Sequence, residues 1–249
     1  MAEPRDDVHA PDAQEQRRRF LVRALTSGLL VGGLGWNLPA LAALFGKLPS
    51  KMPAGKSIFE LKGEVRVDGQ PATLDTLVTA QSKIETGGDS YVILAVGDGA
   101  FIVRERTIFE LGGKELFIHS MQLLTGALLS VFGHRDPDQW VDAHTPFSSM
   151  GIRGTGFYTE ANADKAYFCT CYGRTLITAS ADPGETEEIV SRHHDAPRYI
   201  LAQPQQGKRI VPAPFKNHTD LELMTLEALC GRKVPFVPSP DYDRPRRDY

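Results

Sequence analysis

The sequence predicts a mainly β domain with a small C-terminal helical extension. Val65 and Val67 alternate with charged residues, which is the pattern of a half-buried strand. The run Tyr91–Val96 is apolar on both faces, and Gly and Asp turns recur along this part of the chain. Strands that recur about every ten residues are typical of a β-sandwich, barrel or solenoid.

Each strand is expected where an apolar segment ends in a turn. The segment GEVRVDG (63–69) ends in a turn dipeptide, and YVILAV (91–96) is followed by the turn Gly97-Asp98-Gly99. A hairpin therefore links 91–96 to a strand over 101–111. Further strands are expected over 123–132, 156–161, 165–173, 175–180 and 198–202.

One helix is expected over 219–230. Thr219 followed three residues later by Glu222 is a capping box, and leucines follow at helical spacing. Gly231 ends the helix. Cys230 lies on the apolar stripe and is predicted to be a core thiol.

The N-terminal region has the pattern of an export signal. Residues 1–16 are polar and are expected to be disordered. Segment 17–46 combines a basic start with an uncharged, moderately apolar stretch, so it is interpreted as a signal or as a membrane anchor through residues 24–45. The similarity to a twin-arginine signal rests on Arg17, Arg18, Phe20 and Leu21. The following chain is expected in the periplasm, either soluble or anchored to the inner membrane.

Composition and motifs argue against two classes of function. The chain has 28 Lys and Arg against 31 Asp and Glu, so it offers no basic field for a nucleic acid. It contains no Walker loop, HExxH or GxSxG motif. A Cys–His nucleophile pair, such as Cys171 with His193 or His194, would need an oxyanion hole that no motif supplies. We therefore expect binding rather than catalysis.

Three segments follow one another in a recognisable order, and they are GEVRVDGQPA (63–72), SKIETGGDSYVILAVGDGAFIVRERTIFEL (82–111) and AHTPFSSMGIRGTGFYTE (143–160). Together they resemble the FecR domain, the periplasmic sensing module of bacterial iron-uptake regulators. The resemblance covers residues 57–180, and it implies stacked or solenoidal short strands and a protein partner in the cell envelope. The matching positions are Gly63, Val65, Ile84, Thr86, Gly87, Leu94, Asp98, Gly99, Thr145, Pro146, Arg153, Gly154, Thr155 and Phe157.

The chain also departs from that family. A full FecR-type regulator carries a longer cytoplasmic segment that binds a sigma factor, whereas this chain has only 16 polar residues there. Sigma-factor regulation is therefore not carried over. The expected protein is an exported FecR-like binding or sensing module, with an extension over 181–235 and a disordered tail over 236–249.

The glycine-rich end of the resemblance is expected to be structural. Gly151 and Gly154 permit positive φ angles and close backbone approach around Arg153 and Thr155. The Arg153 guanidinium is expected to lie against backbone carbonyls or a carboxylate.

The stretch YFCTCYG places Cys169 and Cys171 on one face of a strand. With His193 and His194 in a following loop, these thiols could hold Zn, Fe or Cu. Such a site supports an alternative function, a periplasmic metal-binding protein with a redox role or without one. The remaining histidines are expected at the surface, and they are His119, His134, His144 and His218.

Two other interpretations of the cysteines stay open. Cysteine is among the most buried residue types, so both thiols could simply pack in a core. A disulfide or redox pair is allowed in the oxidising periplasm, although a bridge from Cys169 to Cys171 would close a very small, strained ring. A third function, a structural domain that scaffolds an envelope assembly, requires no metal.

Overall fold

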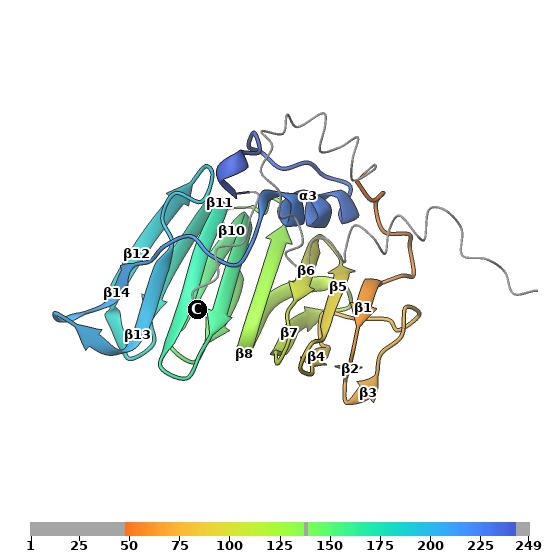
Figure 1. Ribbon diagram of the computed structural model, residues 1–249, viewed down its shortest axis with the longest axis horizontal. Coiled ribbons are helices and arrows are strands. Elements are labelled where there is room, and N and C mark those ends of the chain that lie inside the picture. Colours follow the sequence, from red (N-terminus) through yellow and green to blue (C-terminus); the bar gives the residue numbers. More distant parts are fainter. Residues whose placement is uncertain (1–47, 137–138, 243–249) are drawn as a thin grey trace, which may run out of the picture. The chain divides into compact units, whose positions relative to one another are not determined.

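The computed structural model describes residues 48–136 and 139–242, and most of the described chain forms one β-sheet (Figure 1). The expected export signal and membrane tether lie outside the described residues. Within the described ranges, no helix is long and apolar enough to cross a membrane. The prediction of a mainly β fold with a short C-terminal helix is confirmed, because fourteen strands join in one sheet and are followed by helix α3.

The strands follow one another with short connections. They are β1 (Ile58–Lys62), β2 (Val65–Val67), β3 (Gln70–Pro71), β4 (Lys83–Thr86), β5 (Tyr91–Val96), β6 (Gly99–Val103), β7 (Ile108–Lys114), β8 (Phe117–Phe132), β9 (Val141–Thr145), β10 (Ser148–Ala161), β11 (Lys165–Ala179), β12 (Asp182–Ser191), β13 (Arg198–Gln205) and β14 (Lys208–Pro212). Helix α3 (Asp220–Leu229) and a short 3₁₀ turn, η1 (Pro240–Tyr242), complete the described elements.

Neighbouring strands are antiparallel except for β8 and β9, which are parallel. The main path through the sheet is β14-β13-β11-β10-β9-β8-β7-β4-β2-β3, and β1, β5 and β6 join it through β8. Strand β12 pairs with β11.

The long strands β8, β10 and β11 each pair with different strands along their length. The first part of β8 pairs with β7, and the part after Gly126 pairs with β6 and β10. Likewise, β11 pairs with β13 before Gly173 and with β12 from Gly173 onward. Gly126 and Gly173 have φ angles of 87° and 94°, which an L side chain rarely adopts, so glycine permits both bends.

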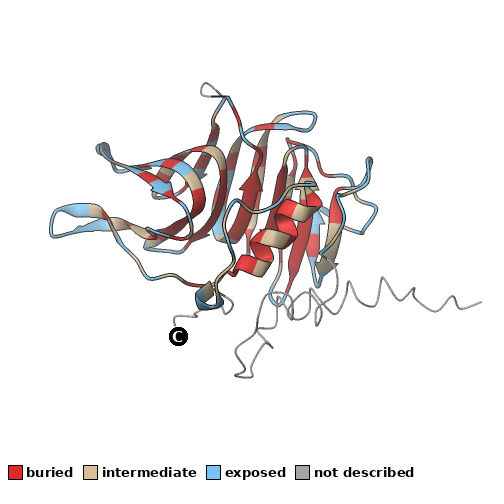
Figure 2. Cartoon of the chain, turned by 90° about the horizontal axis from the view of Figure 1, so that it is seen from above, coloured by how far each residue is buried: buried red, intermediate tan, exposed pale blue. Residues whose placement is uncertain are grey.

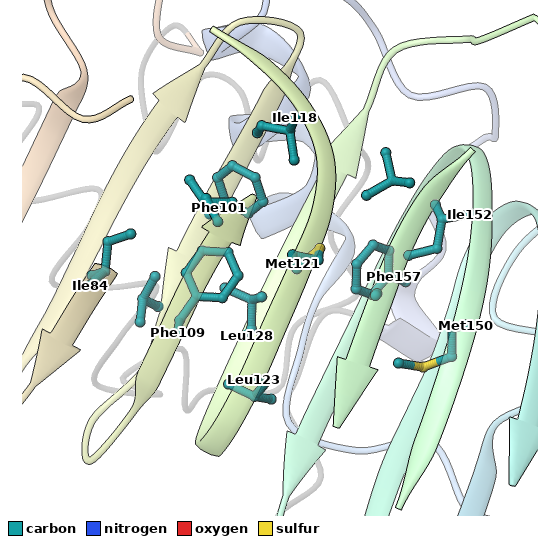
Figure 3. Close-up of a cluster of buried hydrophobic side chains, with 14 of the residues drawn as sticks. Ile84, Phe101, Phe109, Ile118, Met121, Leu123, Leu128, Met150, Ile152 and Phe157 are labelled. Atoms are coloured by element: carbon teal, nitrogen blue, oxygen red, sulfur yellow. The ribbon is translucent and has the colours of Figure 1, made fainter. Parts of the chain in front are cut away.

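One face of the sheet, called here the core face, carries the main hydrophobic cluster (Figure 3). Successive phenylalanine rings lie 5.2–6.3 Å apart across it, in the range of favourable aromatic pairs. These rings belong to Phe109, Phe101, Phe132, Phe157 and Phe168.

The opposite face, called here the helix face, is also buried. A cross-strand row runs over β5, β6, β8, β10 and β11, and its members are Ile93, Ile102, Leu129, Tyr158 and Cys169. All five are at most 2% exposed. Helix α3 contacts β6 and β8, and its buried residues lie against the sheet (Figure 2). Burial of both faces explains the nearly continuous apolar sequence of β5.

Helix α3 forms as the sequence predicts. Thr219 is the N-cap, and the reciprocal bonds of the capping box to Glu222 are both present. Cys230 is the C-cap residue and is partly buried.

Several strand predictions are wrong in their extent. Strand β8 begins at Phe117 rather than at residue 123, and β10 begins at Ser148 rather than at residue 156. The expected strand over 101–111 is interrupted at Arg104–Thr107, where Arg106 has a φ of 51°, so β6 and β7 pair with different parts of β8. The expected strands over 165–173 and 175–180 form one bent strand, β11. The sheet also continues past residue 180, because both β12 and β13 pair with β11.

The bend at Gly126 gives a stability prediction. A Cβ at this position would lie 2.6 Å from the Thr107 Cα, so Gly126→Ala adds a backbone clash to the strain of a positive φ. We expect the variant to lose about 3 kcal/mol of unfolding free energy in urea titrations. Gly69→Ala is the control, since Gly69 has a φ of 78° and open space around it; it should lose only about 1 kcal/mol. Equal losses in both variants would show that the bend tolerates a side chain.

Candidate metal site

The two cysteines lie on the helix face of β11, as their spacing predicts. Their neighbours Phe168 and Thr170 face the other way, and Phe168 belongs to the main hydrophobic cluster. Both thiols are 0% exposed. They are therefore buried outside that cluster, beneath the C-terminal part of the chain.

Two histidines converge on these thiols. The Nδ1 of His194 lies 3.6 Å from the Cys169 Sγ, and the Nε2 of His218 lies 3.3 Å from the Cys171 Sγ. The two ring nitrogens are 3.1 Å apart. One donor atom from each of the four residues lies within 4.8 Å of all the others.

The ligand set differs from the expected one at a single residue. His193 does not join the cysteines, because its Nε2 lies 2.8 and 2.9 Å from the two carboxylate oxygens of Asp220. The surface prediction for His218 is wrong, since the residue is 0% exposed. It directly precedes the N-cap Thr219, and nothing in its local sequence pattern marked it as buried.

Contacts with strands β10 and β11 place the rings of both histidines. His194 has a φ of 57°, and its backbone N–H donates to the Cys171 carbonyl oxygen at 2.9 Å, which ties the loop after β12 to β11. His218 stacks on the Tyr158 ring of β10 with ring centroids 4.7 Å apart.

Hydrogen-bond partners assign the proton on each imidazole. The Nδ1 of His218 lies 2.7 Å from the Lys216 carbonyl oxygen, and the Nε2 of His194 lies 3.1 Å from an Asp220 carboxylate oxygen. Each of these nitrogens faces an acceptor and therefore carries the proton. When both rings are neutral, the other nitrogens, 3.1 Å apart, carry lone pairs that point at each other. A cation between them satisfies both, and such outward acceptors are the usual second shell of metal-bound histidine.

The separations fit a tetrahedral ion. With Zn–N of about 2.05 Å and Zn–S of about 2.3 Å, tetrahedral geometry puts two nitrogens about 3.4 Å apart and nitrogen and sulfur about 3.6 Å apart. The observed N–N distance is 3.1 Å, and the two S–N distances are 3.3 and 3.6 Å. The described residues thus offer a Cys₂His₂ donor set close to that required by zinc.

The electrostatic surroundings favour a thiolate at Cys169. Burial acts to raise the pKa of this thiol, but the hydrogen bond from Cys171, followed by the interaction with the His218 ring, outweighs it, and the pKa lies well below its usual value. Burial and the neighbouring Cys169 hold the pKa of Cys171 well above the usual value. The thiolate is the form that ligates metals, so this shift favours ligation by Cys169.

Asp220 is the carboxylate that supports both histidines of the loop. Burial opposes its ionisation, yet hydrogen bonds from His194 and His193 keep the pKa of Asp220 below its ordinary value. A charged carboxylate in this position orients the His194 ring and strengthens its Nδ1 as a ligand.

A buried ion pair holds the segment that carries His218. The Lys216 Nζ lies 3.0 Å from the Oε2 of Glu160 on β10. Asn217 and Tyr158 donate to the other oxygen of Glu160 at 2.6 and 2.8 Å. One carboxylate on the sheet therefore fixes the two residues that precede His218.

The glycine-rich motif lies around Trp140. The Arg153 guanidinium carbon is 3.8 Å from the centroid of the Trp140 ring, and a Cβ on Gly151 would meet that ring at 2.6 Å. Gly154 has a φ of 52°, and the Thr155 hydroxyl donates to the Arg153 carbonyl oxygen at 2.9 Å. The guanidinium thus lies against an aromatic ring, and the structural role of the motif stays a prediction.

Removing the charge of Glu160 tests the ion pair. Glu160→Gln removes the carboxylate charge that faces the buried Lys216 ammonium, so we expect a loss of about 3 kcal/mol of unfolding free energy at pH 7. The control Glu64→Gln removes an exposed ion pair with Arg66 and should cost less than about 1 kcal/mol.

The same pair has a defined pH dependence. Burial opposes ionisation of Glu160, but Asn217 and Lys216 hold its pKa below the ordinary value of 4.5. Its stabilisation is therefore present above pH 4.5 and is lost as the pH falls through the lower folded value. The difference between wild type and Glu160→Gln should shrink over that acid range, and a constant difference would contradict this role.

Comparison with known proteins gives limited similarity. Searches with protein-family profiles and against curated proteins find no match. Two crystal structures of candidate anti-sigma factors from Parabacteroides distasonis share 10% identity with this chain, each with a TM-score of 0.44. One covers 57% of this chain and 70% of its own, and the other covers 63% and 82%.

Proposed function

We propose that this chain is an exported, FecR-like binding module that holds a metal ion, with a signalling or interaction role in the cell envelope rather than a catalytic one. The observation that carries the proposal is the convergence of four donor atoms under the C-terminal part of the chain. The donors belong to Cys169, Cys171, His194 and His218. A tetrahedral S₂N₂ set favours zinc among the common metals.

The geometry argues against a site made only of packed thiols. Packing would explain the burial of Cys169 and Cys171, but it would leave the lone pairs of His194 and His218 opposed at 3.1 Å. Both rings also turn a nitrogen toward an outer acceptor, the Lys216 carbonyl oxygen for His218 and Asp220 for His194, as metal-bound histidines usually do. A cation accounts for both features.

A disulfide between the two cysteines is also disfavoured. Residues i and i+2 of an extended strand are about 6.7 Å apart at Cα, at the upper limit for a disulfide, and their side chains are parallel. All three cysteines of the chain are free.

The site is better suited to holding elements together than to catalysis. Catalytic zinc sites keep one coordination position open for water or substrate, whereas four protein donors fill a tetrahedral ion. These donors come from β11, from the loop after β12 and from the residue before the cap of α3. An ion here would cross-link three parts of the chain that are distant in sequence.

Metal content tests this proposal directly. Protein purified without a His tag or chelator should contain about one zinc per chain by elemental analysis, and added zinc should raise its Tm. We expect Cys169→Ser with Cys171→Ser to lose both effects, and His218→Ala to lose most of the bound zinc. Cys230→Ser and His119→Ala are matched controls that should retain one zinc, because neither residue supplies a donor to the Cys₂His₂ cluster.

The opposite result would overturn metal binding. If the wild-type protein contains no metal and zinc does not change its Tm, the cluster is a packing arrangement. Equal zinc content in wild type and in the double cysteine variant would place the ion elsewhere.

The export step has its own test. Replacing both Arg17 and Arg18 by Lys keeps the charge but removes the arginine pair of the proposed signal. We expect the variant to stay with the cytoplasmic fraction, while the wild-type protein appears in the periplasmic or membrane fraction. An unchanged distribution would contradict twin-arginine export.

A further inference from the structure

The chain that follows α3 crosses directly over the histidines of the site. We call residues 233–242 the C-terminal strap. The Phe236 ring stacks on His193 with centroids 4.2 Å apart and an interplanar angle of 19°. The Tyr242 ring lies 4.6 Å from His193 and also 4.6 Å from His194. The strap therefore contacts the ligand His194 and its neighbour.

A shared carboxylate gives the strap its third attachment. The Ser239 backbone N–H donates to the Asp220 Oδ2 at 2.8 Å. The Oδ1 of the same carboxylate accepts from the His194 Nε2 at 3.1 Å, and His193 lies within 2.9 Å of both oxygens. Asp220 thus connects the strap to a proposed metal ligand through one hydrogen bond on each side.

Two further ring contacts hold the strap: the Phe236 centroid lies 5.6 Å from that of Tyr172, and the Tyr242 centroid lies 4.7 Å from that of Phe215. The strap is otherwise little buried. Between Lys233 and Tyr242 none of its residues is buried, and Val237 is 81% exposed. Its regular structure is limited to the short turn η1. A segment with few buried contacts opens at low free-energy cost, so small changes at its attachment points shift its docking.

We infer that metal binding at the Cys₂His₂ cluster and docking of the C-terminal strap are coupled. This inference rests on the proposed metal site. A bound ion fixes the His194 ring with its Nε2 toward Asp220, and this places the carboxylate for Ser239 and the imidazoles for Phe236 and Tyr242. Without the ion, the opposed nitrogens of His194 and His218 favour rotation of a ring, which removes these attachments.

Coupling of this kind works in both directions. If the ion favours the docked strap, the docked strap must favour the bound ion by the same factor. The strap also lies over the imidazoles, so it should slow departure of the ion. Metal occupancy would then change the exposed surface of the module, which is the output that a binding or sensing role requires.

Chymotrypsin offers a probe of docking that needs no variant. The Phe236–Val237 bond becomes accessible when Phe236 leaves His193, and cleavage there removes residues 237–249. We expect zinc to slow this cleavage by about tenfold or more, within the usual range of coupling between two sites. Cleavage after Phe117, which is 46% exposed in the described structure, is the internal control and should not respond to zinc.

The reciprocal measurement is the rate at which a chelator removes zinc. In Phe236→Ala with Tyr242→Ala, we expect removal to be about 10–100-fold faster than in wild type, the range seen when groups around metal ligands are lost. Val237→Ala is the matched control in the same segment and should behave as wild type, because its side chain is exposed. Circular dichroism of each variant checks that the sheet is intact.

The outcomes separate the two proposals. If wild-type protein binds no zinc, the metal site fails and the coupling fails with it. If zinc binds with the expected stoichiometry but changes neither the cleavage at Phe236 nor the chelation rate of the double variant, only the coupling is overturned.

Discussion

The structure depends on the burial of both faces of β10 and β11. Alternate residues of β11 face opposite ways, so Phe168 enters the core face while Cys169 and Cys171 lie on the helix face. That second face cannot be left in water without exposing Tyr158 and its apolar neighbours. The C-terminal part of the chain packs on the helix face and brings His194 and His218 over the two thiols. The candidate site is therefore a consequence of how the second face is closed.

Closing a face over polar groups requires that each of them finds a partner. Glu160 is balanced by Lys216, and Asp220 accepts hydrogen bonds from two histidines and from the backbone of Ser239. The imidazole N–H groups of His194 and His218 also have acceptors. The remaining groups are the lone pairs of the His194 Nδ1 and the His218 Nε2, which are directed at the centre of the cluster. The proposed cation would be the partner that completes this arrangement, since burial of these groups without a partner would be costly.

Much of the local structure was predictable because its signals are local. The apolar run Tyr91–Val96, the capping box at Thr219 and the shared face of Cys169 and Cys171 each follow from spacing alone. The bend at Gly173, where one strand continues through a glycine, has the same sequence signal as a turn between two strands. The choice between His193 and His218 depends on packing of β11 against a segment some fifty residues later, which no local pattern encodes.

The most direct test of the central claim is the X-ray absorption spectrum of the zinc-loaded protein at the zinc edge. The account predicts a four-coordinate ion with two sulfur ligands at about 2.3 Å and two imidazole nitrogens at about 2.0–2.1 Å. A shell of oxygen and nitrogen without sulfur would contradict it, because the ion would then be bound away from Cys169 and Cys171.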